Sequence, residues 1–380
     1  MRYLLQRPLP DELLGSVWIR TARRAGLPIR TVARVLTNGR KWAPGFFTAG
    51  HLVDLATVLG MQPIDLLWEH TVFPYATAFH APEVFESAMA AAVSTGTAAI
   101  GMGAVTQSAS DQVRFRRYCT RCAREERAAW GESYWHRAHN LPGVLMCLKH
   151  GNALRVTEVQ TGNRTWESAL PHELGGRRTS ETRPDAFEVE LARRSVELLL
   201  RPQRQPLVRE PQWYRDELIE RGLLSPDRQL NASRLAAWLL ERTGGRMRRF
   251  GFNAKDAELK WPALMVRPRT GIPFVPLKHL VFQTALALQP LSEKPVLDHA
   301  PVGPSGRPRE QLDKQFSTAV RAVIRAYVRK GERVRVCDAL AEAGCWQLYR
   351  HSSQDFPRVT EAVRHLRLSA ASYRPKYRPR

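Results

Sequence analysis

The sequence predicts a mainly α-helical protein in which helix-turn-helix-like modules flank a small zinc-binding module. Two observations predict the helices: apolar residues recur at intervals of three and four, and Gly and Pro separate the segments that carry them. A third observation, a cluster of Cys and His residues in the second quarter of the chain, predicts the metal module. The length of 380 residues suits two to four modules.

The N-terminal part is expected to consist of several short helices joined by tight turns. Asp11 is expected to cap the first helix, which carries Leu14 and Trp18 and ends near Gly26. Such short helices are compatible with a helix-turn-helix unit, and equally with an ordinary small bundle. The further helices of this part are expected at 31–36, at about 48–59, and from Pro63 onward.

The C-terminal half is expected to be helical as well. One amphipathic helix begins near Asp185, and Asn231 is expected to cap another that ends at Gly244. The more apolar segment 274–288 is expected to pack in a core. The remaining helices are expected at 213–221, at 316–329, and as a pair within 336–368.

These patterns predict seven segments. The boundaries follow changes in composition, above all the polar stretch after the metal module and the Pro-rich stretch near residue 300. The predicted segments are an N-terminal helical domain (1–113), a zinc-binding module (114–158), a linker (159–184), a helical domain (185–291), a Pro-rich linker (292–312), a C-terminal helical domain (313–368) and a basic tail (369–380).

The charge balance indicates a polyanionic partner. Lys and Arg total 58 against 36 Asp and Glu, which leaves a net charge of +22 and a pI of about 10.6. A protein with such an excess binds nucleic acid by neutralising phosphates and releasing counterions. Because 49 of the 58 are Arg, an Arg-rich genome would produce part of the same bias. No segment predicts a signal peptide or a membrane span, so a cytoplasmic, nucleoid-associated protein is expected.

The strongest local motif is a pair of short metal-ligand repeats. Cys119 and Cys122 form C-x2-C, and after 24 intervening residues Cys147 and His150 form C-x2-H. Three thiolates and one imidazole satisfy tetrahedral Zn²⁺ without an open position, so the predicted role is structural. In a cytoplasmic protein, clustered thiols favour a metal over disulfides.

Neighbours of this motif leave alternatives open. His136 and His139 lie between the two halves, and either is an alternative fourth ligand. Basic residues around the pairs, Arg116, Arg117, Arg121, Arg124 and Lys149, are expected to offset the thiolate charge and could face phosphate. Glu125 and Glu126 are expected to be a solvated helix start, and Cys337 and Cys345 to be buried structural thiols.

No motif of an enzyme is found. The acidic residues are scattered or lie on helix faces, without the converging carboxylates that two-metal phosphodiester cleavage needs. A P-loop is absent from the sequence, so ATP hydrolysis is not expected. Clustering of basic residues instead suggests DNA-phosphate contacts in two places, with Arg30, Arg34, Arg40 and Lys41 in the N-terminal helices and Arg246, Arg248 and Arg249 in the C-terminal half.

At these residues the chain resembles the TniQ/TnsD family of transposition target-selection proteins. The N-terminal half carries the resemblance in the segments 8–16, 118–122, 134–144 and 147–151, which include both metal-ligand pairs. The second half is similar to longer TnsD members in the segments 213–222, 261–267 and 276–280. The resemblance places the zinc ligands on Cys119, Cys122, Cys147 and His150.

The resemblance also implies a function and its partners. Family members mark an insertion site on double-stranded DNA and recruit the AAA+ regulator of the transposon, which resembles TnsC. Some recognise DNA directly, whereas others are delivered by a CRISPR effector complex. The alternative function is therefore a protein–protein adaptor without sequence-specific DNA binding, linking such a complex to the transposition machinery. A homodimer is compatible with a helical protein, although no heptad run requires one.

Overall fold

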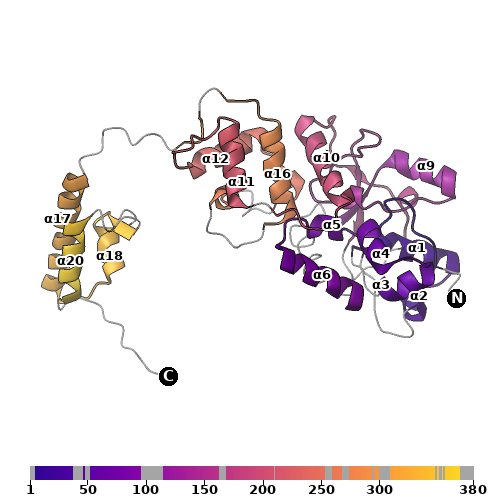
Figure 1. The fold of residues 1–380 in the computed structure, drawn as a ribbon, viewed down its shortest axis with the longest axis horizontal. Helices are drawn as coiled ribbons and strands as arrows, with labels where there is room; N and C mark the ends of the chain where they lie inside the picture. Colours follow the sequence, from indigo (N-terminus) through magenta and orange to yellow (C-terminus); the bar gives the residue numbers. More distant parts are fainter. Residues whose placement is uncertain are drawn as a thin grey trace, which may run out of the picture. The chain divides into compact units, whose positions relative to one another are not determined.

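The computed structural model divides the chain into two compact units, Met1–Asp298 and His299–Arg380. Figure 1 shows that helices dominate both, which confirms the predicted mainly helical fold. Each unit is described by itself. The residues that the structure describes are 5–36, 46–47, 52–95, 114–161, 168–208, 210–252, 259–267, 274–292, 295–298, 309–346, 349–350, 353 and 356–368.

Unit 1 begins with a set of short helices. Gly26 ends the first of them in a left-handed conformation (φ 63°), and its amide donates to the carbonyls of Ala22 and Arg23, as expected for a C-cap glycine. Leu14, Trp18 and their neighbours on the same face are buried. The helices are α1 (Leu14–Ala25), α2 (Ile29–Leu36), α3 (Leu52–Leu59), α4 (Pro63–His70), α5 (Phe73–Ala76) and α6 (Pro82–Thr95).

The predicted N-cap of α1 is wrong. The cap position is Leu13, and its amide donates to the carbonyl of Trp135 (2.9 Å). Asp11 has a positive φ of 56°, and its carboxylate accepts hydrogen bonds from the Nε of Arg137 (3.1 Å) and the amide of Ala138 (3.2 Å). The Asp11 carboxylate therefore binds Arg137, 126 residues further along the chain, instead of capping the helix that follows it.

A small antiparallel sheet follows α6 in the chain. Its order is β1 (Phe115–Tyr118), β2 (Arg155–Gln160), β3 (Arg177–Arg178), and Tyr118 pairs with Arg155 where β1 ends. Part of the segment predicted as a linker, 159–184, thus forms a strand. Around the sheet lie α9 (Thr120–Trp130) and the short 3₁₀ turns η2 (Ala138–Asn140) and η3 (Pro171–Glu173).

The rest of unit 1 is helical. Asn231 caps one of its helices through the amides of Ser233 and Arg234, as the sequence predicts. The helix expected to begin near Asp185 does so, and the Asp185 side chain caps it by accepting from the amide of Glu188. The helices are α10 (Ala186–Leu200), α11 (Pro211–Glu220), α12 (Ala232–Thr243), α13 (Met247–Phe250), α15 (Trp261–Val266) and α16 (Pro276–Ala287).

One hydrophobic core runs through all of unit 1. The ring of Phe79, which follows α5, stacks on His279 of α16 with centroids 4.0 Å apart. Trp68 of α4 donates its indole N–H to the carbonyl of Arg201 (2.9 Å), just after α10. The helices before the sheet therefore pack directly on those after it, while the finer division of this unit into modules stays a prediction.

Unit 2 contains α17 (Arg309–Lys330), α18 (Val336–Glu342) and α20 (Pro357–Leu368) around a core of its own. Buried Val320 and Ile324 of α17 belong to this core together with Val359 and Leu366 of α20. Across the described parts of the whole chain, no helix combines the length and apolarity that crossing a bilayer requires.

Candidate metal centre

The first ligand pair stands where a strand passes into a helix. Cys119 follows β1 as the N-cap residue of α9, and Cys122 lies in the first turn of that helix. Because the helix advances only about 4.5 Å over three residues, both thiols reach the same point beyond the strand end. The β1–α9 junction is held in place by the pairing of Tyr118 with Arg155 in β2.

The second pair lies in a tight hairpin turn that leads toward β2. The amide of Gly151 donates to the carbonyl of Cys147 (2.8 Å), and the Cys147 amide donates to the carbonyl of Asn152 (2.9 Å). Gly151 occupies the left-handed region (φ 66°), which side chains with a Cβ rarely adopt. This turn presents Cys147 and His150 to the first pair.

The four side chains converge on one point. Nδ1 of His150 lies 3.5 Å from Sγ of Cys119, 3.3 Å from Sγ of Cys122 and 3.6 Å from Sγ of Cys147. Sγ of Cys122 lies 3.7 Å from Sγ of Cys147. A zinc tetrahedron with Zn–S near 2.3 Å and Zn–N near 2.0 Å needs S–S edges of about 3.8 Å and S–N edges of about 3.5 Å. The donor atoms therefore fit a tetrahedral ion, and the cluster could hold a metal.

The ionisation of the three thiols also favours a cation. Hydrogen bonds from Cys122 and Cys147 lower the pKa of Cys119. Hydrogen bonding to Cys119 raises the pKa of Cys122, and raises that of Cys147 to about 11. Three buried thiols this close ionise together only when a positive charge lies among them, and a divalent metal ion supplies that charge.

Glu125 orients the imidazole of the cluster. Its carboxylate lies 2.8 Å from Nε2 of His150 and 2.7 Å from Nζ of Lys149. Nδ1 of the imidazole therefore faces the thiols, and its Nε2–H donates to the carboxylate of Glu125. A carboxylate in this position is the usual outer-shell partner of a metal-bound His. Sequence reasoning missed this role and expected a solvated helix start. The available signal was its position, one helical turn after Cys122.

Neither alternative His completes the cluster. His136 lies between two carboxylates, with Nδ1 3.2 Å from Asp11 and Nε2 2.6 Å from Glu126. Burial alone would lower its pKa, but these hydrogen bonds raise it to about 9. His139 is buried, and burial lowers its pKa to about 3. Glu126 is itself buried, so the expectation of a solvated side chain is wrong for this residue.

Cys122, Glu126 and His136 also lie close enough to form a second three-ligand group. Asp11 and Glu126 already satisfy both ring nitrogens of His136, and Glu126 also accepts from the amide of Tyr134 (3.2 Å). This group is explained by an ion-pair network that joins α9 to the segment before α1. The ligand set with a fitting geometry is the one completed by His150.

Two of the expected phosphate-facing arginines lie in the interior instead. Arg117 donates to the carbonyls of Val144 and Leu141, both at 2.6 Å, and is 1% exposed. The guanidinium of Arg116 lies over the rings of Phe46 (4.5 Å) and Trp135 (5.4 Å). Arg116 is equally buried. Both side chains stabilise the module from inside, whereas Arg121 and Arg124 of α9 are exposed.

Some of the candidate DNA-contact side chains are exposed to solvent, and others form ion pairs within the protein. Arg30 and Arg34 are exposed one turn apart on α2, and Arg248 of α13 is exposed. Two others form ion pairs within the protein. Arg246 pairs with Asp185 and lies 3.6 Å from Glu188, and Arg249 lies 3.1 Å from Glu188. Arg40 and Lys41 lie outside the described residues.

The two remaining Cys residues differ in environment. Cys345 is buried in the core of unit 2, as expected. Cys337 is only half-buried on α18, with its thiol 3.6 Å from Asp338, so the expectation of a buried thiol is wrong for this position.

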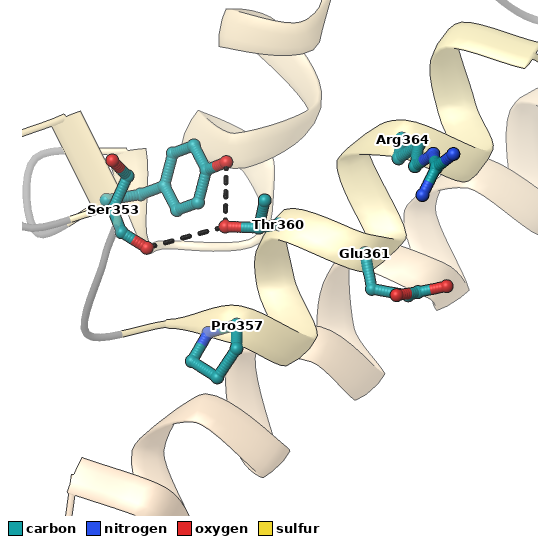
Figure 2. A pocket seen from close by; sticks show the side chains of 6 residues that line it. Ser353, Pro357, Thr360, Glu361 and Arg364 are labelled. Carbon is teal, nitrogen blue, oxygen red and sulfur yellow. Dashed lines mark hydrogen bonds between the residues drawn. The ribbon is translucent and has the colours of Figure 1, made fainter.

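Unit 2 also has a surface hollow of about 430 Å³ beside α20. Figure 2 shows the side chains that line it. Tyr349 donates to the hydroxyl of Thr360 (3.1 Å), which donates in turn to the carbonyl of Ser353 (3.4 Å). These bonds tie the chain before α20 to the helix, so the polar groups here have a structural explanation.

The fold and the cluster together define a mainly helical protein with a Cys₃His cluster that could hold a metal ion. Residues 4–154 match the TniQ family model, so this chain carries a TniQ domain over about two fifths of its length. The match contains all four ligand residues. TniQ proteins are non-catalytic adaptors that function in transposition with DNA and transposition proteins, and the domain implies a role in target selection. No curated protein matches the chain.

Proposed function

We propose that this protein selects the insertion site of a transposon by engaging target DNA and recruiting the AAA+ regulator of transposition, and that it is not an enzyme. The observation that supports this most is that the Cys₃His cluster lies inside the matched TniQ domain, in a geometry suited to a closed structural ion. A closed site leaves no position for a substrate or an activated water. The ion therefore serves the fold, and function resides on the surface around it.

The proposed ion is Zn²⁺, held by Cys119, Cys122, Cys147 and His150. Three thiolates and an imidazole are soft and borderline donors, which favour zinc over magnesium or calcium. These ligands come from the β1–α9 junction and from the turn before β2, so the ion would join the two ends of the module. His150 would be oriented by Glu125.

The proposed DNA contacts are the exposed members of the predicted set. Arg30 and Arg34 project from one face of α2, and Arg248 is exposed at α13. Arg246 and Arg249 act differently in this proposal. Because Asp185 and Glu188 engage them, they stabilise the α10–α13 contact rather than bind phosphate. Arg40 and Lys41 remain proposed contacts on the strength of the sequence alone.

The test of DNA engagement uses the purified full-length protein and fragmented host and transposon DNA at near-physiological salt, with bound fragments sequenced. Enrichment of one discrete site supports a selector that reads DNA itself. Enrichment of no site contradicts autonomous selection and favours the adaptor function, in which another complex, such as a CRISPR effector, delivers the protein.

The test of recruitment is an association assay between this protein and the AAA+ regulator encoded by the same transposon, with and without target DNA. Formation of a complex supports the proposal. A regulator that loads on DNA equally well without this protein would contradict it. An unrelated AAA+ ATPase serves as the matched control.

A further inference from the structure

The second unit carries a concentration of positive charge that the proposed DNA contacts do not include. Residues 299–380 contain seventeen Lys and Arg but seven Asp and Glu, a net charge of +10. This fifth of the chain therefore holds nearly half of the total charge of +22. The tail beyond Leu368 supplies four of these cations, but most belong to the helices.

The described cations gather along one face of α17. Lys314, Arg321, Arg325 and Arg329, here called the cationic strip, are separated by seven, four and four residues. Such spacings place side chains on one side of a helix. All four are exposed, whereas Asp313, Val320 and Ile324, about 100° further round the helix, are buried. The strip is about 22 Å long at 1.5 Å per residue.

Within α17, acidic residues occur only at the start, at Glu310 and Asp313, and Glu310 stands one turn before Lys314. From Lys314 to Lys330 the sequence contains no Asp or Glu, and Asp313 is buried against the start of α20. Among the described residues, the arginines of the strip form no ion pair. Arg325 and Arg329 lie 3.3 Å from the carbonyls one turn before them, within α17. Elsewhere exposed arginines do have acidic partners, as Arg204 has Asp65 and Arg335 has Asp338.

We propose that the cationic strip of α17 binds the phosphate backbone of double-stranded DNA independently of base sequence. Duplex DNA carries one charge per about 1.7 Å of its axis, so a straight row of cations about 22 Å long faces several phosphates at once. The role rests on the proposed target-selection function. It adds a second, sequence-independent contact outside the TniQ domain, which would position the protein without specifying the site.

The structure favours nucleic acid over an anionic membrane as the partner. A helix that binds a membrane surface inserts an apolar face between lipids. The apolar face of α17 is instead packed in the core of unit 2, with Val320 fully buried and Ile324 8% exposed. The exposed side of α17 carries the cationic strip, and although Val328 is 49% exposed there, a single valine offers no apolar face to insert between lipids, which suits a hydrated polyanion.

The test compares two charge-matched triple variants of the full chain. In the first, Arg321, Arg325 and Arg329 are replaced by Gln. In the control, the ion-paired arginines Arg193, Arg204 and Arg335 are replaced by Gln, which removes the same net charge. Binding to a labelled random-sequence duplex is measured by fluorescence anisotropy between 50 and 200 mM salt. Melting curves establish that each variant is folded.

The expected result is a smaller salt dependence in the strip variant alone. Loss of three phosphate contacts reduces the slope of log affinity against log salt concentration by about 2.7 in magnitude. Between 50 and 200 mM salt, the wild-type affinity therefore falls about 40-fold further than that of the variant. Arg→Lys replacement at the same three positions is expected to keep the slope, because the charge remains. Equal losses in the strip and control variants, or an unchanged slope in the strip variant, would overturn the proposal.

Two further measurements distinguish DNA binding by the strip from RNA or membrane binding, and from failure of the target-selection function itself. A loss confined to an RNA duplex or to anionic vesicles, with DNA binding unchanged, also overturns it. Recruitment of the AAA+ regulator is measured in parallel on the same variants. If recruitment and site selection persist while the slope is unchanged, the strip proposal fails and the target-selection function stands.

Discussion

The carboxylate of Glu125 lies 2.8 Å from Nε2 of His150, on the far side of the imidazole from the three thiols. Both ring nitrogens of this His are therefore engaged, one by the cluster and one by an exposed carboxylate. The contact fixes which nitrogen faces the thiols. It also connects the surface of α9 with the metal centre.

Replacing Glu125 by Gln is expected to weaken zinc affinity about 10- to 100-fold without unfolding the protein, because an outer-shell partner is lost while all four ligands remain. Competition with a chromophoric chelator measures the affinity. Glu83→Gln, at an exposed position on α6, is the matched control. Equal zinc affinity in the wild type and both variants would show that Glu125 does not support the ion.

Replacing Cys122 by Ser is expected to abolish stoichiometric zinc and to destabilise the TniQ domain, because a structural ion contributes its binding free energy to folding. Elemental analysis gives the metal content, and thermal melting with and without chelator gives the stability. Cys337→Ser is the control, since that thiol is half-buried in unit 2. Retention of zinc and an unchanged melting curve in the Cys122 variant would refute the assignment.

The network around His70 predicts a loss of stability in acid. Burial lowers the pKa of His70 to about 4, against 6.5 in the unfolded chain, and its Nδ1 lies 3.0 Å from the carbonyl of Glu12. Because the unfolded state takes up the proton first, this stability is complete above about pH 6.5. It is lost as the pH falls toward 4, at no more than about 1.4 kcal/mol per pH unit.

Urea unfolding of the wild type and of His70→Asn, measured from pH 7.5 to 5, tests this expectation. The variant should be less stable at neutral pH but should lose less stability on acidification. Zinc must be saturating at each pH, so that release of the ion does not mimic the effect. Parallel curves for the two proteins would contradict the role of His70.

Asp313 is expected to stabilise unit 2 by capping α20 from another helix. Its two carboxylate oxygens accept from the amides of Arg358 and Val359, both at 3.0 Å. Removing such a cap costs about 1–2 kcal/mol. Asp313→Ala should therefore increase amide exchange in α20, read by hydrogen–deuterium exchange. The exposed substitution Gln311→Ala on the same helix is the control, and unchanged α20 protection in the Asp313 variant would exclude the cap.

Features that depend on neighbours in the chain were predictable. Gly26, Asp185 and Asn231 end or begin helices where the sequence placed them, because capping involves only the next few backbone groups. The Cys119–Cys122 and Cys147–His150 pairs were predicted for the same reason, since ligands three residues apart meet within one turn. Their convergence in the structure agrees with that local reasoning.

Features that depend on distant partners were decided by the tertiary structure alone. Asp11 carries the sequence signature of an N-cap, but its partners His136 and Arg137 come from across the fold. Arg117 belongs to a basic run, yet it is buried because the carbonyls of Leu141 and Val144 satisfy its guanidinium. A sequence thus specifies caps, turns and paired ligands through short-range bonding. Which charges are buried, paired or left facing solvent depends on contacts that form only when remote segments pack together.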